Sequence, residues 1–283
     1  MSWAFVLIII FFLLVFIYAM WRGSRLPKCF PNNFLINDEN YKEIVICCGD
    51  SITHGRIGYD WVSKLEDEDK SRIYINAGIN GDLAWNLYQR IEEIINCNPD
   101  IITILIGTND AMGSQSKKLG NDYIKMKKLP QRPSIDWYQE NYDLIISKLM
   151  NDTNSKIYLV TLPWIGEKED DKIIDIVKNH NTVIEKLAKK HKLEVIPFFD
   201  KIDKIINANI SQELKHQLAY KYMINYKRLL RIMRAIVLHY IFGFTWNKIG
   251  NKYILRTLCD FIHLNENGGL LLKDLIQVHL NSK

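Results

Sequence analysis

Short apolar runs alternate with longer amphipathic stretches from residue 41 onward, and this alternation limits the possible folds more than any other feature of the sequence. The alternation is typical of β-α-β units, and continuous apolar runs suit strands that are buried on both faces of a parallel sheet. The expected strands are 43–48, 73–76, 101–106, 156–161 and 194–197, and the expected helices between them include 83–95, 134–150 and 170–190. The pattern predicts a three-layer α/β/α domain with a five-stranded parallel sheet.

A separate apolar segment precedes this domain. Residues 3–21 contain no charged side chain, and nineteen helical residues at about 1.5 Å each span about 28 Å, close to the thickness of the hydrocarbon core of a bilayer. Trp3 and Trp21 stand at its two ends, where aromatic side chains suit the membrane interfaces. The sequence predicts a single-pass transmembrane anchor with a basic flank over residues 1–28, followed by a linker over 29–40.

A cleaved signal peptide and a buried helix of a soluble protein are the two alternatives for this segment. A signal peptide fits less well, because no basic residue precedes the apolar run and no clear small-x-small site stands near Ala19. The run is also longer than the usual ~7–15 residues. A buried helix fits less well because no polar face interrupts the run.

Charge gives a weak preference for orientation. Arg22, Arg25 and Lys28 follow the apolar segment and no basic residue precedes it, so the positive-inside rule favours a body on the cytoplasmic side. The five cysteines are an odd number at scattered spacings, which is typical of free thiols in a reducing compartment. They form no group with histidine of the kind that binds zinc, so we expect no structural metal.

A basic segment at 211–256 interrupts the alternation within the domain 41–283. It contains nine basic residues and one acidic residue, and it is longer than a connection between elements needs to be. Apolar and basic side chains within it fall on opposite faces of one helix. The basic face holds Lys227, Arg228, Arg231 and Arg234. An amphipathic basic helix of this kind predicts binding to an anionic membrane surface.

Four polar blocks stand where strands end or helices begin. They are Gly49-Asp50-Ser51, the run from Asn76 to Asp82, Gly107-Thr108-Asn109-Asp110, and Asp260-Phe261-Ile262-His263. Ligands of open parallel sheets bind outside the carboxyl ends of the strands, so Ser51 and the later strand ends stand where a reacting group would lie. Together the blocks resemble the SGNH (GDSL-type) hydrolase family. The resemblance implies a flavodoxin-like fold and hydrolysis of esters or thioesters by a serine nucleophile, without a cofactor.

Three residues of these blocks are expected to form a catalytic triad. The resemblance implies that Ser51 is the nucleophile, and a serine hydroxyl is a poor nucleophile until a nearby base takes its proton. His263 suits the role of that base at neutral pH. Asp260, three residues earlier, can fix the tautomer of His263 and stabilise the imidazolium that forms.

Acyl transfer also needs hydrogen-bond donors for the negative charge that develops on the carbonyl oxygen, typically about 3–4 kcal/mol each. The resemblance implies that these donors are the Ser51 backbone N–H, the Gly81 backbone N–H and the side-chain amide of Asn109. Glycine at position 81 is expected because a side chain there could keep the backbone from approaching substrate. Supporting hydrogen bonds without a direct role are expected from Asp50, Asp82 and Asp110.

Two further side chains compete for these roles. His54 is a rival base, but it shares the helix start of Ser51 and only Asp50 could orient it, so His263 is preferred. Cys48 could be mistaken for a nucleophile, yet in an apolar strand a cysteine is expected to be a small buried hydrophobic residue.

The leading prediction is a membrane-anchored serine esterase that cleaves a lipid-like acyl ester or thioester at a membrane surface. A glycan O-acetylesterase is the alternative with the same fold, since Trp85, Trp137 and Trp164 could stack on sugar rings. A non-catalytic, membrane-tethered binding module is the third possibility, and the intact triad argues against it. Nucleic acid is not an expected partner, because the basic segment is rich in apolar residues and carries no recognised nucleic-acid motif. Head group, acyl-chain length and oligomeric state stay open.

Overall fold

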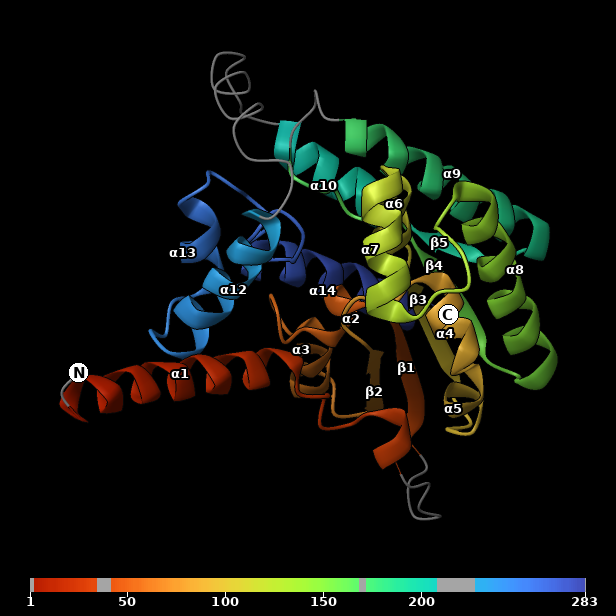
Figure 1. Ribbon diagram of the computed structural model, residues 1–283. Coiled ribbons are helices and arrows are strands. Elements are labelled where there is room, and N and C mark those ends of the chain that lie inside the picture. Colours follow the sequence, from red (N-terminus) through yellow and green to blue (C-terminus); the bar gives the residue numbers. More distant parts are fainter. Residues whose placement is uncertain (1–2, 35–41, 168–171, 208–226, 283) are drawn as a thin grey trace.

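The computed structural model describes residues 3–34, 42–167, 172–207 and 227–282 (Figure 1). Five strands form one sheet, in the order β2-β1-β3-β4-β5, and every neighbouring pair is parallel. The strands are β1 (Glu43–Gly49), β2 (Arg72–Gly78), β3 (Ile101–Leu105), β4 (Lys156–Val160) and β5 (Glu194–Ile196). Nearly all residues of the first four strands are buried, as strands between two helix layers must be. The predicted five-stranded parallel sheet is confirmed.

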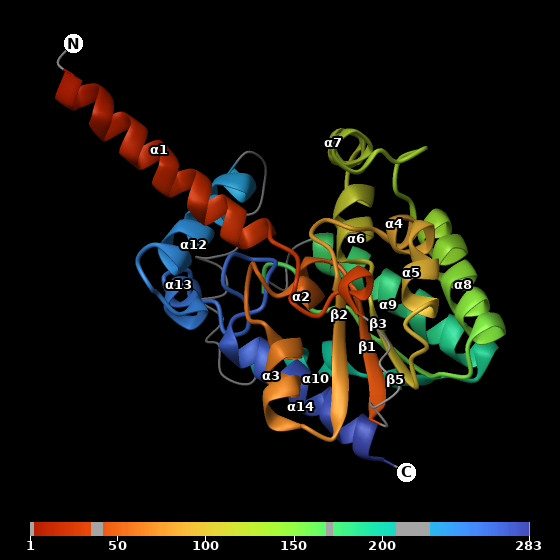
Figure 2. The same cartoon turned by 90° about the horizontal axis from the view of Figure 1, so that it is seen from below.

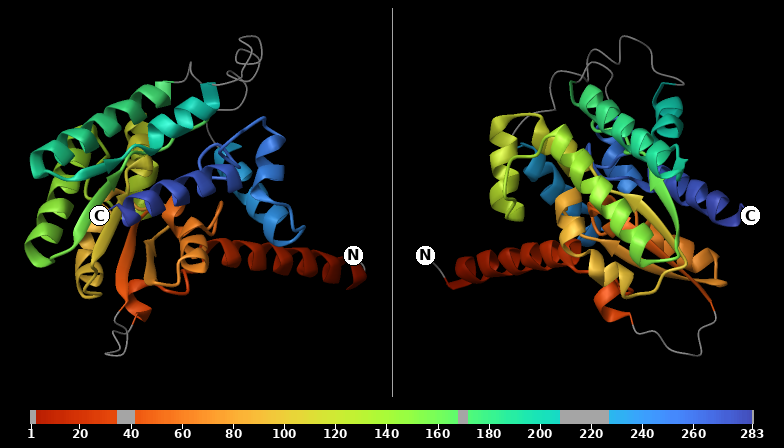
Figure 3. Two further views of the ribbon diagram at one scale, coloured as in Figure 1. Left: turned by 180° about the vertical axis from the view of Figure 1, so that it is seen from behind. Right: turned by 90° about the vertical axis from the view of Figure 1, so that its right-hand side faces the viewer.

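Helices cover both faces of the sheet and give the three layers that the sequence predicts. One layer contains α3 (Trp61–Glu68), α10 (Phe198–Asn207) and α14 (Glu266–Asn281). The other contains α4 (Ala84–Gln89), α5 (Ile91–Ile95), α8 (Ile135–Asp152) and α9 (Lys172–His191). Figure 2 shows the sheet between these two groups, and the two views of Figure 3 show α14 from behind and α8 from the side.

The predicted helix at 83–95 is two short helices that meet at Arg90, whose backbone leaves the helical conformation. The guanidinium of Arg90 reaches the Asp82 carboxylate at 3.0 Å and the Ala77 carbonyl oxygen at 2.8 Å. These contacts come from residues outside the segment, and helical periodicity carries no information about them.

Shorter helices lie beyond the carboxyl ends of the strands. They are α2 (Ser51–His54), α6 (Thr108–Ser114) and α7 (Lys117–Lys127), followed late in the chain by α12 (Lys227–Tyr240) and α13 (Trp246–Asn251). Residues 211–226 of the predicted basic insert lie outside the described residues, and so do residues 35–41, which include the end of the predicted linker. A 3-10 turn, η1 (Pro31–Asn33), precedes β1.

Gly49 lets α2 turn back onto the end of β1. A Cβ at this position would lie 2.1 Å from Thr53 Oγ1 and 2.5 Å from the Leu105 carbonyl oxygen, so any larger residue would force the strand and helix apart. The glycine therefore places the first turn of α2, which begins at Ser51, directly above the sheet.

The N-terminal helix α1 (Trp3–Ser24) projects from the body (Figures 1 and 2). Its segment Phe5–Ser24, with a mean hydropathy of 2.6, is long and apolar enough to cross a membrane, a test that a signal sequence also passes. Most of its large apolar side chains are exposed, so this helix does not form part of the core of the body. Near its C-terminal end, however, Ala19 is fully buried, and α1 packs against α12.

Candidate active site

Ser51 begins α2, and the neighbouring Asp50 caps that helix. The Asp50 carboxylate accepts a hydrogen bond from the Ile52 backbone N–H at 2.9 Å, which satisfies one of the free amides of the first turn. The cap fixes the direction in which the Ser51 side chain leaves the backbone. Ser51 is 6% exposed, so its hydroxyl lies in a largely dry environment that remains open to a ligand.

The fold brings His263 and Asp260 to Ser51 from a position 212 residues later in the chain. His263 Nε2 lies 2.9 Å from Ser51 Oγ, and His263 Nδ1 lies 2.8 Å from Asp260 Oδ2. All three side chains are buried. This geometry allows the hydroxyl to donate to the imidazole while Nδ1–H donates to the carboxylate, the arrangement that makes a serine hydroxyl nucleophilic.

The loop that carries Asp260 holds its carboxylate in the ionised form. Burial opposes ionisation, but the neighbouring His263 and hydrogen bonds outweigh it, so the pKa of Asp260 stays below its ordinary value. Asp260 Oδ1 accepts from the backbone N–H groups of Ile262 at 3.1 Å and His263 at 2.9 Å. The carboxylate is therefore available to orient the imidazole.

The three residues expected to donate hydrogen bonds to the oxyanion lie around one pocket. Ser51, Gly81 and Asn109 all line one pocket. Among the described residues, the Ser51 and Gly81 N–H groups donate to no protein acceptor. Gly81 has a φ of +77°, while a Cβ there would meet Lys127 and Met126 at an ordinary 3.5 Å. The backbone conformation, rather than lack of space, is thus what favours glycine at this position.

Asn109 is oriented by partners from three parts of the chain. Its Nδ2 donates to the Asp82 carbonyl oxygen at 3.0 Å and to Asp50 Oδ2 at 3.3 Å, and its Oδ1 accepts from the Tyr123 hydroxyl at 2.8 Å. The Tyr123 hydroxyl and the two acceptors together fix which end of the amide is the donor and which is the acceptor. Sequence reasoning missed Tyr123, since a tyrosine within an ordinary helix such as α7 gives no signal of this contact.

Three further carboxylates form ion pairs or hydrogen bonds with residues around the site. Asp82 forms ion pairs with Arg90 at 3.0 Å and Lys127 at 2.6 Å. Asp110 accepts from the Ala84 backbone N–H at 3.1 Å, while Asp50 caps α2 as described above. Burial raises the pKa of Asp50 and of Asp110 to about 7, against ordinary values near 3.8.

The pocket above Ser51 and His263 has a volume of about 480 Å³. Its walls combine apolar side chains with a few polar groups, including Gln115, Lys118, Asp122 and Arg228. The apolar lining consists of Ile57, Met112, Leu119, Met126, Leu229, Ile232 and Ile262. A concave pocket of this size, mostly apolar with a few polar groups, is typical of sites that bind small molecules.

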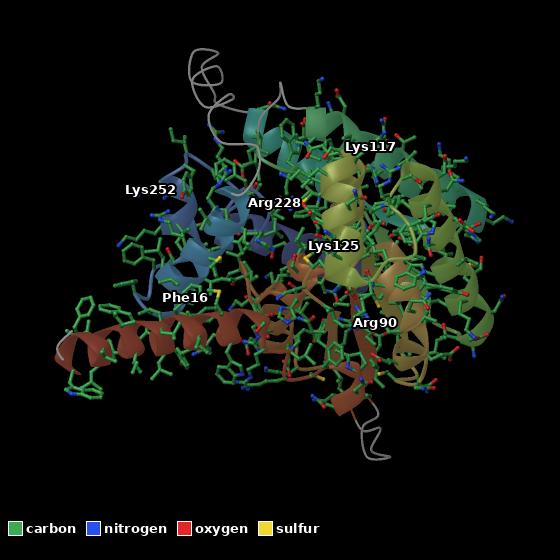
Figure 4. The ribbon with its side chains drawn as sticks, viewed as in Figure 1. Phe16, Arg90, Lys117, Lys125, Arg228 and Lys252 are labelled. Carbon is green, nitrogen blue, oxygen red and sulfur yellow. The ribbon has the colours of Figure 1, made fainter. Side chains whose placement is uncertain are left out.

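The predicted basic face of α12 is turned toward the body. Arg228 lines the pocket and lies at the start of α12, on the side of α7 (Figure 4). Arg231 stacks over the Phe261 ring at 4.5 Å, and Arg234 donates to the Tyr253 hydroxyl at 2.7 Å. The side chain of Lys227 lies outside the described residues. On the same helix, Leu229 and Leu230 are exposed.

Neither of the two rival residues lines the pocket that contains Ser51 and His263. The ring of His54 is buried and hydrogen-bonds with the backbone of Arg25, and burial lowers its pKa to about 4. Cys48 is enclosed within β1, and burial raises the pKa of its thiol.

None of the three tryptophans considered for sugar stacking lines the described pocket above Ser51. Trp164 is 1% exposed and donates to Asp203 Oδ1 at 3.1 Å. Trp85 and Trp137 stack on each other with ring centroids 6.2 Å apart.

Comparisons with solved structures show the same fold. The acetyl xylan esterase AlAXEase has 22% sequence identity and a TM-score of 0.55, over 84% of this chain and 99% of that one. The acetylxylan esterase Axe2 from Geobacillus stearothermophilus has 16% identity and a TM-score of 0.56, over 85% and 95%. A GDSL-like lipase from Bacteroides thetaiotaomicron has 16% identity and a TM-score of 0.54, over 88% and 93%.

The curated proteins gave no match to this sequence. The profile of the GDSL-like lipase/acylhydrolase family matches residues 47–268, which include all four polar blocks. The chain therefore belongs to the GDSL-like lipase/acylhydrolase (SGNH) family and is a serine hydrolase that acts on ester bonds.

Proposed function

We propose that the protein is a membrane-anchored serine esterase that hydrolyses a lipid-like acyl ester or thioester at a membrane surface. The observation that carries the proposal is the hydrogen-bonded line of Ser51, His263 and Asp260, in which Ser51 and His263 lie in the wall of a largely apolar pocket. In this proposal α1 is a retained anchor. The exposed leucines of α12 lie beside the pocket, where they would contact lipid.

In the proposed mechanism, Ser51 Oγ attacks the ester carbonyl carbon while His263 Nε2 takes its proton. The Ser51 and Gly81 amides and Asn109 Nδ2 donate to the oxyanion, with Asn109 giving up its longer bond to Asp50. The tetrahedral intermediate collapses when His263 returns the proton to the leaving alcohol. Water, deprotonated by the same imidazole, then attacks the acyl-enzyme and releases the acid, which restores Ser51.

A fluorophosphonate probe tests the nucleophile. We expect wild-type protein in detergent to be labelled, and Ser51→Ala and His263→Ala to lose labelling and ester turnover. Ser71→Ala, which changes a serine in an exposed turn, is the matched control and should be labelled like wild type. Absence of labelling in folded wild-type protein would refute the serine mechanism.

The acyl-chain length of the substrate tests the lipid proposal against its alternative. Acetyl, butyryl and long-chain p-nitrophenyl esters would be compared with and without anionic vesicles. We expect turnover to favour the longer chains and to rise when vesicles are present. Turnover confined to acetyl esters and indifferent to vesicles would instead favour a glycan O-acetylesterase, a function suggested by the acetylxylan esterases among the similar structures.

We further propose that the body faces the cytoplasm, because Arg22, Arg25 and Lys28 follow α1. Asn151 begins an Asn-Asp-Thr glycosylation signal on the exposed end of α8. Expression in a glycosylating cell should leave this site unmodified, and a glycosidase-sensitive mass shift that disappears in Asn151→Gln would place the body on the opposite side.

A further inference from the structure

The C-terminal end of α1 is part of the folded body rather than a free tether. Gly23 faces Ile236 of α12, and a Cβ at Gly23 would lie 3.1 Å from Ile236 Cδ1. Phe16 lies on the side of α1 that faces α12 (Figure 4). Arg22 stacks over the Tyr240 ring at 4.7 Å, and the Tyr240 hydroxyl donates to the Arg56 carbonyl oxygen at 2.7 Å.

The end of α1 also forms a hydrogen bond with a residue that lines the pocket. Asn80 lines the pocket, and its Nδ2 donates at 2.9 Å to the carbonyl oxygen of Gly23. Gly23 is in the last turn of α1, where carbonyl groups have no partner within the helix, so Asn80 supplies a partner that the helix lacks. The Asn80 Oδ1 atom is buried without a partner among the described residues, so the bond to Gly23 is what fixes the orientation of this amide.

The opposite side of the same loop is held by α7. Lys127 Nζ donates to the Asn80 carbonyl oxygen at 3.1 Å and pairs with the Asp82 carboxylate. Gly81 lies between these two residues with a φ of +77°. Glycine can adopt this backbone conformation and many others at similar energy. The direction of the Gly81 N–H therefore depends on how its two neighbours are held.

We infer that Asn80 is a positioning residue, through which the end of the membrane helix α1 holds the Gly81 N–H in the direction needed to receive the oxyanion. The inference rests on the proposed function, because it takes Gly81 as an oxyanion donor. It makes α1 part of the active site as well as an anchor, so that release of α1 from α12 lowers the rate of the chemical step.

Asn80→Ala and Asn80→Asp test the inference in the full chain, in detergent, with a short water-soluble ester. Detergent removes any benefit of lying on a bilayer, so a change in kcat reports the site itself. We expect kcat to fall about tenfold or more in both variants, with KM within about twofold, because misdirected oxyanion donors weaken binding of the transition state and not of the substrate. Asn80→Asp keeps the shape of the side chain but places a carboxylate oxygen against the Gly23 carbonyl oxygen, so the hydrogen bond is lost. Leu13→Ala, in the exposed part of α1, is the control and should keep the wild-type kcat.

A second pair of variants moves α1 without touching the pocket. Gly23→Val should push α1 away from Ile236 and lower kcat. Ile236→Ala makes room for the valine, so the double variant should have a kcat close to that of Ile236→Ala alone. This pair decides the question if the Asn80 variants fail to fold, as judged by thermal unfolding.

Wild-type kcat in Asn80→Ala, or an unaffected Gly23→Val, would overturn the positioning role while fluorophosphonate labelling of Ser51 left the esterase intact. Failure of wild-type labelling would remove both proposals, so the two failures are distinguishable.

Discussion

At the scale of single residues, the site is defined by buried carboxylates held in different charge states. Asp260 is held in its ionised form beside His263, whereas burial raises the pKa of Asp50 and Asp110 to about 7. The difference follows from partners, since Asp260 has an imidazole and two backbone amides whereas Asp110 accepts from the Ala84 amide. Two protonation states can thus exist within one polar cluster near neutral pH.

The raised pKa of Asp110 predicts a pH-dependent cost to stability. Between about pH 4 and pH 7 the folded protein keeps a proton on Asp110 that the unfolded chain releases, so the free energy of unfolding falls as pH rises through this window. Asp110→Asn removes this contribution and keeps an acceptor for the Ala84 amide. From pH 5 to pH 8 we expect the variant to gain on the order of 2 kcal/mol relative to wild type.

Urea unfolding at the two pH values measures this difference. A gap between Asp110→Asn and wild type that stays constant with pH would show that Asp110 is already ionised in the folded protein at pH 5.

The triad of Ser51, Asp260 and His263 could be predicted because each residue belongs to one of the short blocks that resemble the SGNH family, and Asp260 stands only three positions before His263. Tyr123 and Asn80 could not be predicted in the same way. Their contacts join α7 to α6 and the β2–α4 loop to α1, and such contacts depend on how distant elements pack.

At the scale of elements, the loop that carries Asp260 and His263 is held by the carboxylate of Glu167. Glu167 follows β4 and accepts hydrogen bonds from the N–H groups of Arg256, Thr257 and Leu258 at 2.7 to 2.8 Å. The preceding Gly166 N–H donates to the carbonyl oxygen of Phe261 at 2.9 Å. Phe261 has a φ of +81°, so this contact helps to hold a backbone conformation that is unfavourable for a non-glycine residue.

Glu167→Gln should destabilise this loop. An amide has one acceptor atom and one donor atom, so a donor must face at least one of the backbone N–H groups that Glu167 now satisfies. We expect a loss of about 2 kcal/mol in the free energy of unfolding, together with a lower kcat as the triad loop loosens. Thermal unfolding and turnover of a soluble ester measure both effects. Glu185→Gln, on the exposed face of α9, is the control, and an equal effect there would discount the role of Glu167.

Element positions were predictable where one residue pattern dominates. The five strands could be located from buried apolar runs, whereas the division between α4 and α5 depends on Arg90 reaching Asp82 and Ala77. Helical periodicity likewise separated the basic and apolar faces of α12 but did not say which face contacts the body. Aromatic partners in the body, Phe261 and Tyr253, take up Arg231 and Arg234.

At the scale of the whole molecule, α1 and α12 lie side by side at one side of the body (Figure 1), and both helices carry exposed apolar side chains. The pocket adjoins α12, whose Leu229 contributes to its wall. In the proposed function, this arrangement brings lipid directly to the pocket without transfer of an acyl chain through water.

Leu230→Ser tests this arrangement. Leu230 is exposed and does not line the pocket, so we expect activity on vesicle-bound ester to fall several-fold while turnover of a short soluble ester is unchanged. Val278→Ser, which changes another exposed apolar residue near the C-terminal end of α14, is the control. Equal losses on vesicles for both variants would argue against a specific membrane-facing surface.

Ser51 and His263 are 212 positions apart in the sequence, and this separation sets the order in which the parts of the active site are synthesised. A ribosome delivers α1 and the nucleophile early, and the base and its carboxylate only shortly before α14. In the proposed function, the apolar helix α1 enters a bilayer while the emerging chain still lacks the imidazole that accepts the proton of Ser51. Synthesis order by itself keeps the nascent hydrolase inactive until the body closes, and in the proposed function the membrane that receives α1 is therefore not exposed to its activity during insertion.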